Sequence, residues 1–188
     1  MAGGRSTRFG GDKLREPYRG APLVHHAILA VAEVSGDVLV VGAPGRPPDL
    51  PAGVPLLVQE DATEGEGPLV ALSHALGNVR TPLALVAGGD MPDLSRPVLL
   101  EMLRVAEEAD VDAVAVQDGD RFRPLPVVLR LRRARPIAAG LVRNGERRLR
   151  GLLDALRVAV VDEPTWRALD PDARTLFDVD TRDDLGAP

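Results

Sequence analysis

The chain has 188 residues, of which 45% are hydrophobic, 27% are charged and 3% are aromatic, with a net charge of −5 and no cysteine. This length predicts one globular domain, residues 1–188, with a core built from Val, Leu and Ala. The negative charge and the scarcity of aromatic side chains argue against a nucleic-acid-binding protein. Without cysteine the chain has neither a disulfide nor a zinc–thiolate site. No apolar run approaches the length of a membrane span and no secretion signal is visible, so we expect a cytoplasmic protein without membrane association.

Valine-rich apolar runs alternate along the chain with segments of helical periodicity. The expected helices cover residues 22–34, 68–78, 95–109, 132–143 and 147–156. The expected strands cover residues 37–42, 54–59, 83–87, 111–116, 123–130 and 158–161. Two prolines in segment 123–130 are expected to place it at a sheet edge or to mark a strand start. This alternation predicts an α/β fold of three layers, α/β/α, with a mostly parallel sheet.

The first fourteen residues combine glycines with basic side chains and form a candidate ligand-binding loop. Glycine lets a backbone approach a ligand closely, and successive N–H groups form a concave anion site. Lys13 is the only lysine in the chain, and its compact ammonium differs chemically from the planar guanidinium of arginine. We therefore predict that the loop holds a polyphosphate and that Lys13 reaches it. The spacing fits neither a P-loop nor a dinucleotide fingerprint, and a disordered terminus is the alternative reading.

Five stretches of the chain carry a resemblance to a known enzyme family. They are residues 2–13 (AGGRSTRFGGDK), 60–61 (ED), 67–69 (GPL), 90–92 (DMP) and 177–181 (FDVDT). In this order they resemble the motifs of MobA-type molybdenum cofactor guanylyltransferases, which belong to the Rossmann-like nucleotidyltransferase superfamily. The resemblance spans nearly the whole chain. It implies transfer of GMP from GTP to the phosphate of molybdenum-molybdopterin, which releases pyrophosphate and forms the guanine dinucleotide cofactor.

The resemblance also implies roles for individual residues. The expected GTP-binding residues are Ala2, Gly3, Gly4, Lys13, Asp61 and Asp90. The expected catalytic residues are Lys13, Arg8 and Asp90. The two cations would neutralise the α- and β-phosphates and the leaving pyrophosphate, where negative charge develops. From spacing alone, Asp61 is equally well explained as a solvated residue of an acidic loop.

Asp90 follows an expected strand, and ligands in such folds bind at the carboxyl ends of strands. Mg²⁺ takes one or two carboxylates together with phosphates and water, so Mg²⁺ is the expected cofactor and Asp90 its ligand. The alternative is that Asp90 only caps the turn before Pro92, because aspartate is common in turns. No protein nucleophile is required, since the acceptor phosphate attacks directly and the protein contributes positioning and electrostatics.

The chain departs from the family pattern at several positions. Asp178 and Asp180 stand where the family has asparagines near the metal and the acceptor, and their role is left open. Gly42 follows a strand where the family often has an asparagine that contacts the nucleotide. The arginines between residues 130 and 150 are expected to form a solvated helix face, with binding of the acceptor's phosphate as the alternative.

Two rival functions remain open on the sequence. The first is a related nucleotidyltransferase that uses CTP or acts on a sugar or alcohol phosphate. The second is a non-catalytic nucleotide-binding homologue, which Gly42 and the short segment before the glycine loop favour. Maturation proteins of molybdoenzymes are a further candidate partner.

The fold of this family has an apolar strand before the phosphate loop, whereas only Met1 precedes Ala2 here. We therefore expect either that the first strand is truncated or that translation starts upstream of Met1. A form extended by an apolar run is expected to be more stable and to bind GTP more tightly.

Overall fold

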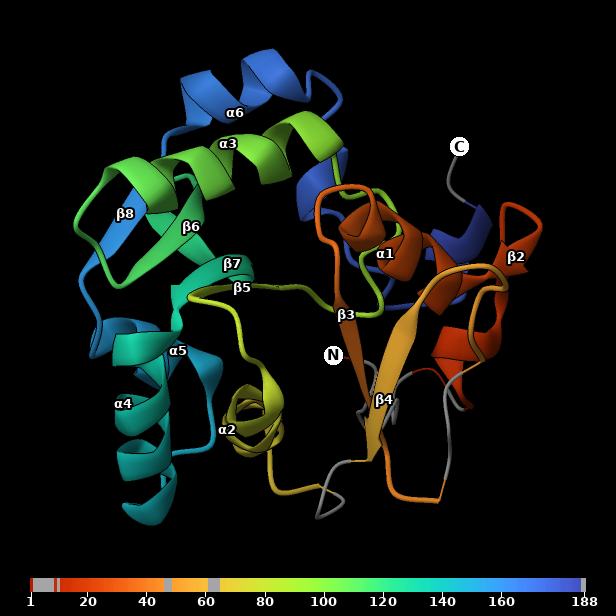
Figure 1. Ribbon diagram of the computed structural model, residues 1–188. Coiled ribbons are helices and arrows are strands. Elements are labelled where there is room, and N and C mark those ends of the chain that lie inside the picture. The colour runs from red at the N-terminus through yellow and green to blue at the C-terminus, as the bar shows by residue number, and fades with distance from the viewer. Residues whose placement is uncertain (2–8, 10, 46–48, 61–64, 187–188) are drawn as a thin grey trace.

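The computed structural model describes residues 1, 9, 11–45, 49–60 and 65–186, and Figure 1 shows their arrangement. The strands are β1 (Pro17–Tyr18), β2 (Ala21–Pro22), β3 (Val38–Gly42), β4 (Leu56–Glu60), β5 (Leu83–Val86), β6 (Ala113–Asp118), β7 (Arg121–Arg130) and β8 (Val158–Val161). The α-helices are α1 (Leu23–Ala32), α2 (Pro68–Asn78), α3 (Arg96–Glu108), α4 (Leu131–Arg143), α5 (Leu149–Asp154) and α6 (Glu163–Leu169). Short 3₁₀ helices are η1 (Lys13–Arg15), η2 (Arg174–Leu176) and η3 (Asp183–Gly186). None of the helices in this described part of the chain is long and apolar enough to cross a membrane.

Helices cover both faces of the four-stranded sheet, as the alternation of strands and helices predicts. The strand order is β5-β7-β6-β8, and α3 and α6 pack on one face while α2, α4 and α5 pack on the other (Figure 1). Successive residues of β7 point to opposite faces, because Val127 and Leu129 lie in the α2 side of the core and Val128 lies in the α3 side. The expected three-layer α/β/α architecture is confirmed.

Strand β7 departs from the expected edge position. It lies between β5 and β6 and runs antiparallel to both, while β5, β6 and β8 share one direction. The other expectation, that its prolines mark the start of a strand, agrees better with the structure. Pro124 and Pro126 precede Val127–Arg130, the part that pairs with β5, so they remove no hydrogen bond from that ladder.

Helix α6 and the hairpin β1–β2 were not expected from the sequence. Helix α6 begins after Asp162, whose carboxylate accepts a hydrogen bond from the Thr165 N–H at 2.9 Å, and Pro164 stands in its first turn. This pairing of an acidic N-cap with an early proline is a helix-start signal that was present in the sequence. The hairpin β1–β2 turns at Arg19 and Gly20, which both have positive φ, and such turns favour glycine.

The arginines between residues 130 and 150 have a third role, beyond a solvated face or a phosphate site. Arg130 donates hydrogen bonds to the carbonyls of Ala106, Ala109 and Val111, around the end of α3. Arg135 donates to the carbonyls of Leu76 and Val79 at the end of α2. Cations are favoured at helix C-termini, so these two arginines fix helix ends.

Strands β3 and β4 form a separate parallel pair that is not hydrogen-bonded to the four-stranded sheet. Met1 lies between the two sheets. Its ammonium donates to the Ala87 carbonyl at 2.6 Å and its carbonyl accepts from the Gly89 N–H at 2.8 Å. Its side chain packs against the clusters that contain Val86 of β5 and Val41 of β3. In the part of the chain described here, Met1 thus stands where a further strand would join β5 to β3.

Candidate functional site

Lys13 and Asp90 meet at the carboxyl end of β5. The Lys13 Nζ lies 2.8 Å from Asp90 Oδ2 and donates a second hydrogen bond, also 2.8 Å, to the carbonyl of Val179. Its Nζ is also 3.8 Å from Asp180 Oδ1. The Lys13 side chain is 15% exposed and that of Asp90 is 31% exposed, so the pair is shielded yet open to solvent on one side. The structure therefore brings together the two residues that the sequence singles out for phosphate and metal binding.

Glycine 88 makes room for the Asp90 carboxylate. A Cβ on Gly88 would lie 2.4 Å from Asp90 Oδ1 and 3.2 Å from the Met91 side chain, distances that no side chain tolerates without movement. The backbone of Asp90 is held as well, because its carbonyl accepts a hydrogen bond from the Val179 N–H at 2.9 Å. Gly88 therefore allows the Asp90 carboxylate to pack closely against the backbone that follows β5.

The C-terminal segment adds two further carboxylates to this site. Asp178 Oδ2 lies 3.0 Å from Arg123 Nη2, and Arg123 also donates to the Leu176 carbonyl at 2.8 Å. Burial raises the pKa of Asp178 to about 6; Arg123 opposes this rise, while Asp90 and Asp180 add to it. Asp178 thus interacts electrostatically with Asp90, Asp180 and Lys13, and the mutual repulsion of the carboxylates favours a cation nearby.

Asp178→Asn is expected to stabilise the metal-free protein above pH 6. The pKa of Asp178 is higher in the folded state, so the folded protein binds more protons than the unfolded chain between about pH 4 and 6. Stability is therefore lost as the pH rises through this window, and the asparagine avoids that loss. The side chain is 35% exposed, so we expect a gain of about 1 kcal/mol after allowing for screening.

Melting temperatures of wild type and Asp178→Asn without divalent cations check this expectation. The two proteins should differ at pH 7.5 and agree near pH 4, and Asp120→Asn on the exposed β6–β7 turn should show no difference at either pH. A less stable Asp178→Asn protein at pH 7.5 would show that the Arg123 ion pair outweighs desolvation.

The structure places part of the expected site. Ala2, Gly3, Gly4, Arg8 and Asp61 lie outside the described residues, so their roles stay predictions. Lys13 and Asp90 are in contact. The sequence did not indicate Arg123 or the Val179 carbonyl, because both reach the site through contacts between segments far apart in the chain.

The described residues include no group of three or more His, Cys, Asp or Glu side chains arranged to hold a metal ion. This does not oppose a magnesium site, since Mg²⁺ usually keeps its waters and binds one or two carboxylates plus substrate phosphates. The donor chemistry fits: Asp90 presents oxygen ligands, and the nearby Asp178 and Asp180 add negative charge.

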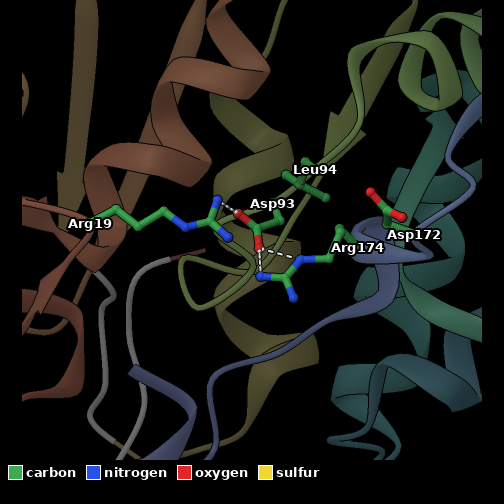
Figure 2. A pocket seen from close by; sticks show the side chains of 5 residues that line it. All are labelled: Arg19, Asp93, Leu94, Asp172 and Arg174. Carbon is green, nitrogen blue, oxygen red and sulfur yellow. Dashed lines mark hydrogen bonds and ion pairs between the residues drawn. The ribbon is translucent and has the colours of Figure 1, made fainter. Parts of the chain in front are cut away.

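A second polar cluster lies beside the site, in a pocket lined by Arg19, Asp93, Leu94, Asp172 and Arg174 (Figure 2). Asp93 stands at its centre and pairs with both guanidiniums. It follows Asp90 by three positions and was not singled out by the sequence, because its partners come from remote segments.

The chain is similar to known proteins over most of its length. The family described as MobA-like NTP transferase domain matches residues 1–160. A protein of Mycobacterium bovis named probable molybdenum cofactor guanylyltransferase is 34% identical over 100% of this chain and 90% of its own length. One of the same name from Chloroflexus aggregans is 33% identical over 98% of this chain and 89% of its own length.

Solved structures share the fold. Molybdopterin-guanine dinucleotide biosynthesis protein A from Archaeoglobus fulgidus has a TM-score of 0.77 at 21% identity, covering 98% of this chain and 92% of its own. 2-C-methyl-D-erythritol 4-phosphate cytidylyltransferase from Thermus thermophilus has a TM-score of 0.70 at 21% identity, covering 95% and 92%. These two proteins confirm the Rossmann-like nucleotidyltransferase fold. With a lysine–carboxylate pair at the end of β5 and a family match over most of its length, the chain belongs to the MobA-like NTP transferase family.

Proposed function

We propose that the protein is a guanylyltransferase that transfers GMP from GTP to the terminal phosphate of molybdenum-molybdopterin. The contact between Lys13 and Asp90 at the end of β5 carries this proposal, because it joins a phosphate-seeking cation to a candidate metal ligand. Full-length relatives named molybdenum cofactor guanylyltransferase support the choice of nucleotide and acceptor. Such a reaction belongs in the cytoplasm, and its product would be handed to maturation proteins of molybdoenzymes.

In the proposed reaction an oxygen of the acceptor phosphate attacks the α-phosphorus of GTP. The bond between this phosphorus and the oxygen shared with the β-phosphate breaks, and pyrophosphate leaves with the electron pair. The protein needs no nucleophile of its own. Its task is to hold two anionic substrates in line and to supply positive charge where charge develops.

Lys13 supplies that charge at a fixed place. An ammonium has three N–H donors, and the Val179 carbonyl and Asp90 receive hydrogen bonds from two of them. The Val179 contact anchors the ammonium, while the bond to Asp90 is the one that a triphosphate would compete for. Arg8 and the glycines 3 and 4 of the same loop are proposed as further phosphate-binding groups.

Asp90 is the proposed ligand of Mg²⁺, which when bound neutralises the triphosphate and polarises its oxygens. Release of Asp90 from Lys13 would give one oxygen-donor group to the ion, with phosphates and water completing the shell. Asp61 is proposed to contact GTP, and Asp178 and Asp180 to hold further positive charge near Asp90.

Pyrophosphate release in the presence of Mg²⁺ and molybdenum-molybdopterin tests the proposal. We expect release with GTP, together with formation of the guanine dinucleotide, and little release with CTP. The cytidylyltransferase among the structural neighbours makes CTP the informative competitor. Release with CTP and none with GTP would refute the choice of nucleotide, and binding of GTP without any release would favour a non-catalytic homologue.

A further inference from the structure

Asp93 is a shielded carboxylate that accepts hydrogen bonds from several directions. Its side chain is 8% exposed. Oδ1 accepts from Arg19 Nη1 at 3.0 Å, while Oδ2 accepts from the Tyr18 hydroxyl at 2.8 Å and from Arg174 Nε at 2.9 Å and Nη2 (Figure 2). Charge-assisted bonds of this kind are short and directional. Asp93 is therefore held by its own protein and is engaged on both oxygens.

The partners of Asp93 belong to the same segments that build the candidate site. Tyr18 and Arg19 lie in the β1–β2 hairpin, which directly follows η1 and Lys13. Arg174 begins η2, which leads to Asp178, Val179 and Asp180. Asp93 itself stands on the loop that carries Asp90. The cluster thus ties together the segments that supply Lys13, its carbonyl anchor and its carboxylate partner.

Apolar packing makes the connection stiff. Tyr18 is fully buried in a cluster with Phe9, Leu23 and Val179. Val179 is the residue whose carbonyl accepts from Lys13 Nζ and whose N–H donates to the Asp90 carbonyl. A displacement of the Tyr18 hydroxyl from Asp93 would therefore be transmitted through Val179 to the ammonium of Lys13, because close-packed interiors transmit strain.

We propose that Asp93 is a positioning residue that sets the geometry of the Lys13–Asp90 pair through Tyr18, Arg19 and Arg174. Both of its carboxylate oxygens are engaged by these three side chains, so its effect on the site is exerted through them. Its importance for catalysis rests on the proposed GMP transfer, whereas its effect on Lys13 does not depend on any substrate. Small displacements of reacting groups cost large factors in rate, so the loss of this carboxylate should reduce turnover more than binding.

Asp112 provides a matched control. It is also a shielded aspartate, 9% exposed, which pairs with Arg157 at 3.2 Å. It precedes β6, which is parallel to β5. Asp112 therefore lies at the amino ends of these strands, whereas Asp90 lies at their carboxyl ends. Asp93→Asn and Asp112→Asn remove the same charge from similar surroundings, and both are expected to lower the melting temperature by similar amounts.

The sole lysine gives a direct readout. In protein labelled with ¹³C and ¹⁵N only in lysine, the side-chain resonances report Lys13 alone. Without nucleotide, Asp93→Asn should shift the ¹³Cε and ¹⁵Nζ signals, while Asp112→Asn should leave them at the wild-type positions. Arg19→Gln, at a side chain 48% exposed, is the milder variant and should cause a smaller shift in the same direction if Asp93→Asn fails to fold.

Turnover provides the second readout. With Mg²⁺, GTP and molybdenum-molybdopterin, we expect Asp93→Asn to lower kcat about tenfold and to change KM for GTP less than threefold. Unchanged Lys13 resonances in both Asp93→Asn and Arg19→Gln would overturn the positioning role. Equal losses of kcat in Asp93→Asn and Asp112→Asn would also overturn it, because a general loss of stability would then explain both. A wild type without GMP transfer would refute the proposed function and leave the resonance test in force.

Discussion

Lys13→Ala is expected to lower the rate of GMP transfer by about 10²–10³-fold, the cost of removing one well-placed electrostatic group from an active site. Among the described residues, Lys13 is the cation whose Nζ contacts both Asp90 and the segment Asp178–Asp180. Its removal leaves Asp90 and Asp180 without this cation, so repulsion of GTP should increase as well. Single-turnover kinetics at saturating GTP separate the loss in chemistry from the loss in binding.

The same experiment with Asp90→Ala separates the two roles. Both variants should keep the near-ultraviolet circular dichroism of the wild type, because neither side chain is fully buried. Asp90→Ala should need more Mg²⁺ for half-maximal rate, whereas Lys13→Ala should keep the wild-type dependence on Mg²⁺. Asp110→Ala, at a side chain 83% exposed before β6, is the control and should match wild type. Wild-type turnover in either Lys13→Ala or Asp90→Ala would disprove the role assigned to that residue.

Local signals predicted the elements well where they depend on neighbours in the sequence. Helix α2 covers residues 68–78 as expected, because a proline in the first turn and a 3.6-residue apolar period define it. Strand β4 begins at Leu56, directly after Pro55, since proline cannot donate to the ladder. Asp184 in η3 accepts hydrogen bonds from the Thr181 N–H at 2.7 Å and from its hydroxyl at 2.9 Å, a contact between residues three positions apart.

What the sequence did not predict depends on contacts across the fold. The central position of β7 follows from its pairing with β5 and β6, and no local pattern encodes which strands become neighbours. The ion pair between Arg123 and Asp178 joins residues 55 positions apart, and the Lys13 bond to Val179 spans 166. Motifs identified Lys13 and Asp90 as important, but the side chains that orient them are recognisable only in the three-dimensional structure.

An apolar extension of about five residues before Met1, rich in Val and Ile, is expected to raise the free energy of unfolding by about 2–4 kcal/mol, or the melting temperature by about 5–15 °C. Strands β3 and β5 are not hydrogen-bonded to each other or to a described strand between them. The Met1 backbone is hydrogen-bonded to Ala87 and Gly89, just after β5, and its side chain packs against the cluster that contains Val41. Residues added before Met1 would therefore run alongside β5. Their apolar side chains would be buried between α2 and the helices on the other face of the sheet.

The extension also removes a buried charge. Burial lowers the pKa of the Met1 ammonium to about 6, although the Asp90 carboxylate opposes this fall. An extended chain replaces the ammonium by a neutral amide N–H, which can donate to the Ala87 carbonyl without the desolvation cost of a charge. The extension would also hold the Met1 backbone in place, and such preorganisation lowers the cost of binding.

GTP affinity should therefore rise together with stability in the extended form. Calorimetric unfolding and titration with Mg²⁺ and GTP measure the two effects on the same samples. A Gly-Ser extension of equal length is the control, since it removes the same ammonium but supplies no apolar side chains and little strand propensity. If the apolar and Gly-Ser forms share one melting temperature and one affinity for GTP, the space between β3 and β5 does not accept a strand. A gain in stability without a gain in affinity would instead show that the phosphate loop is already fixed by Lys13 and Val179.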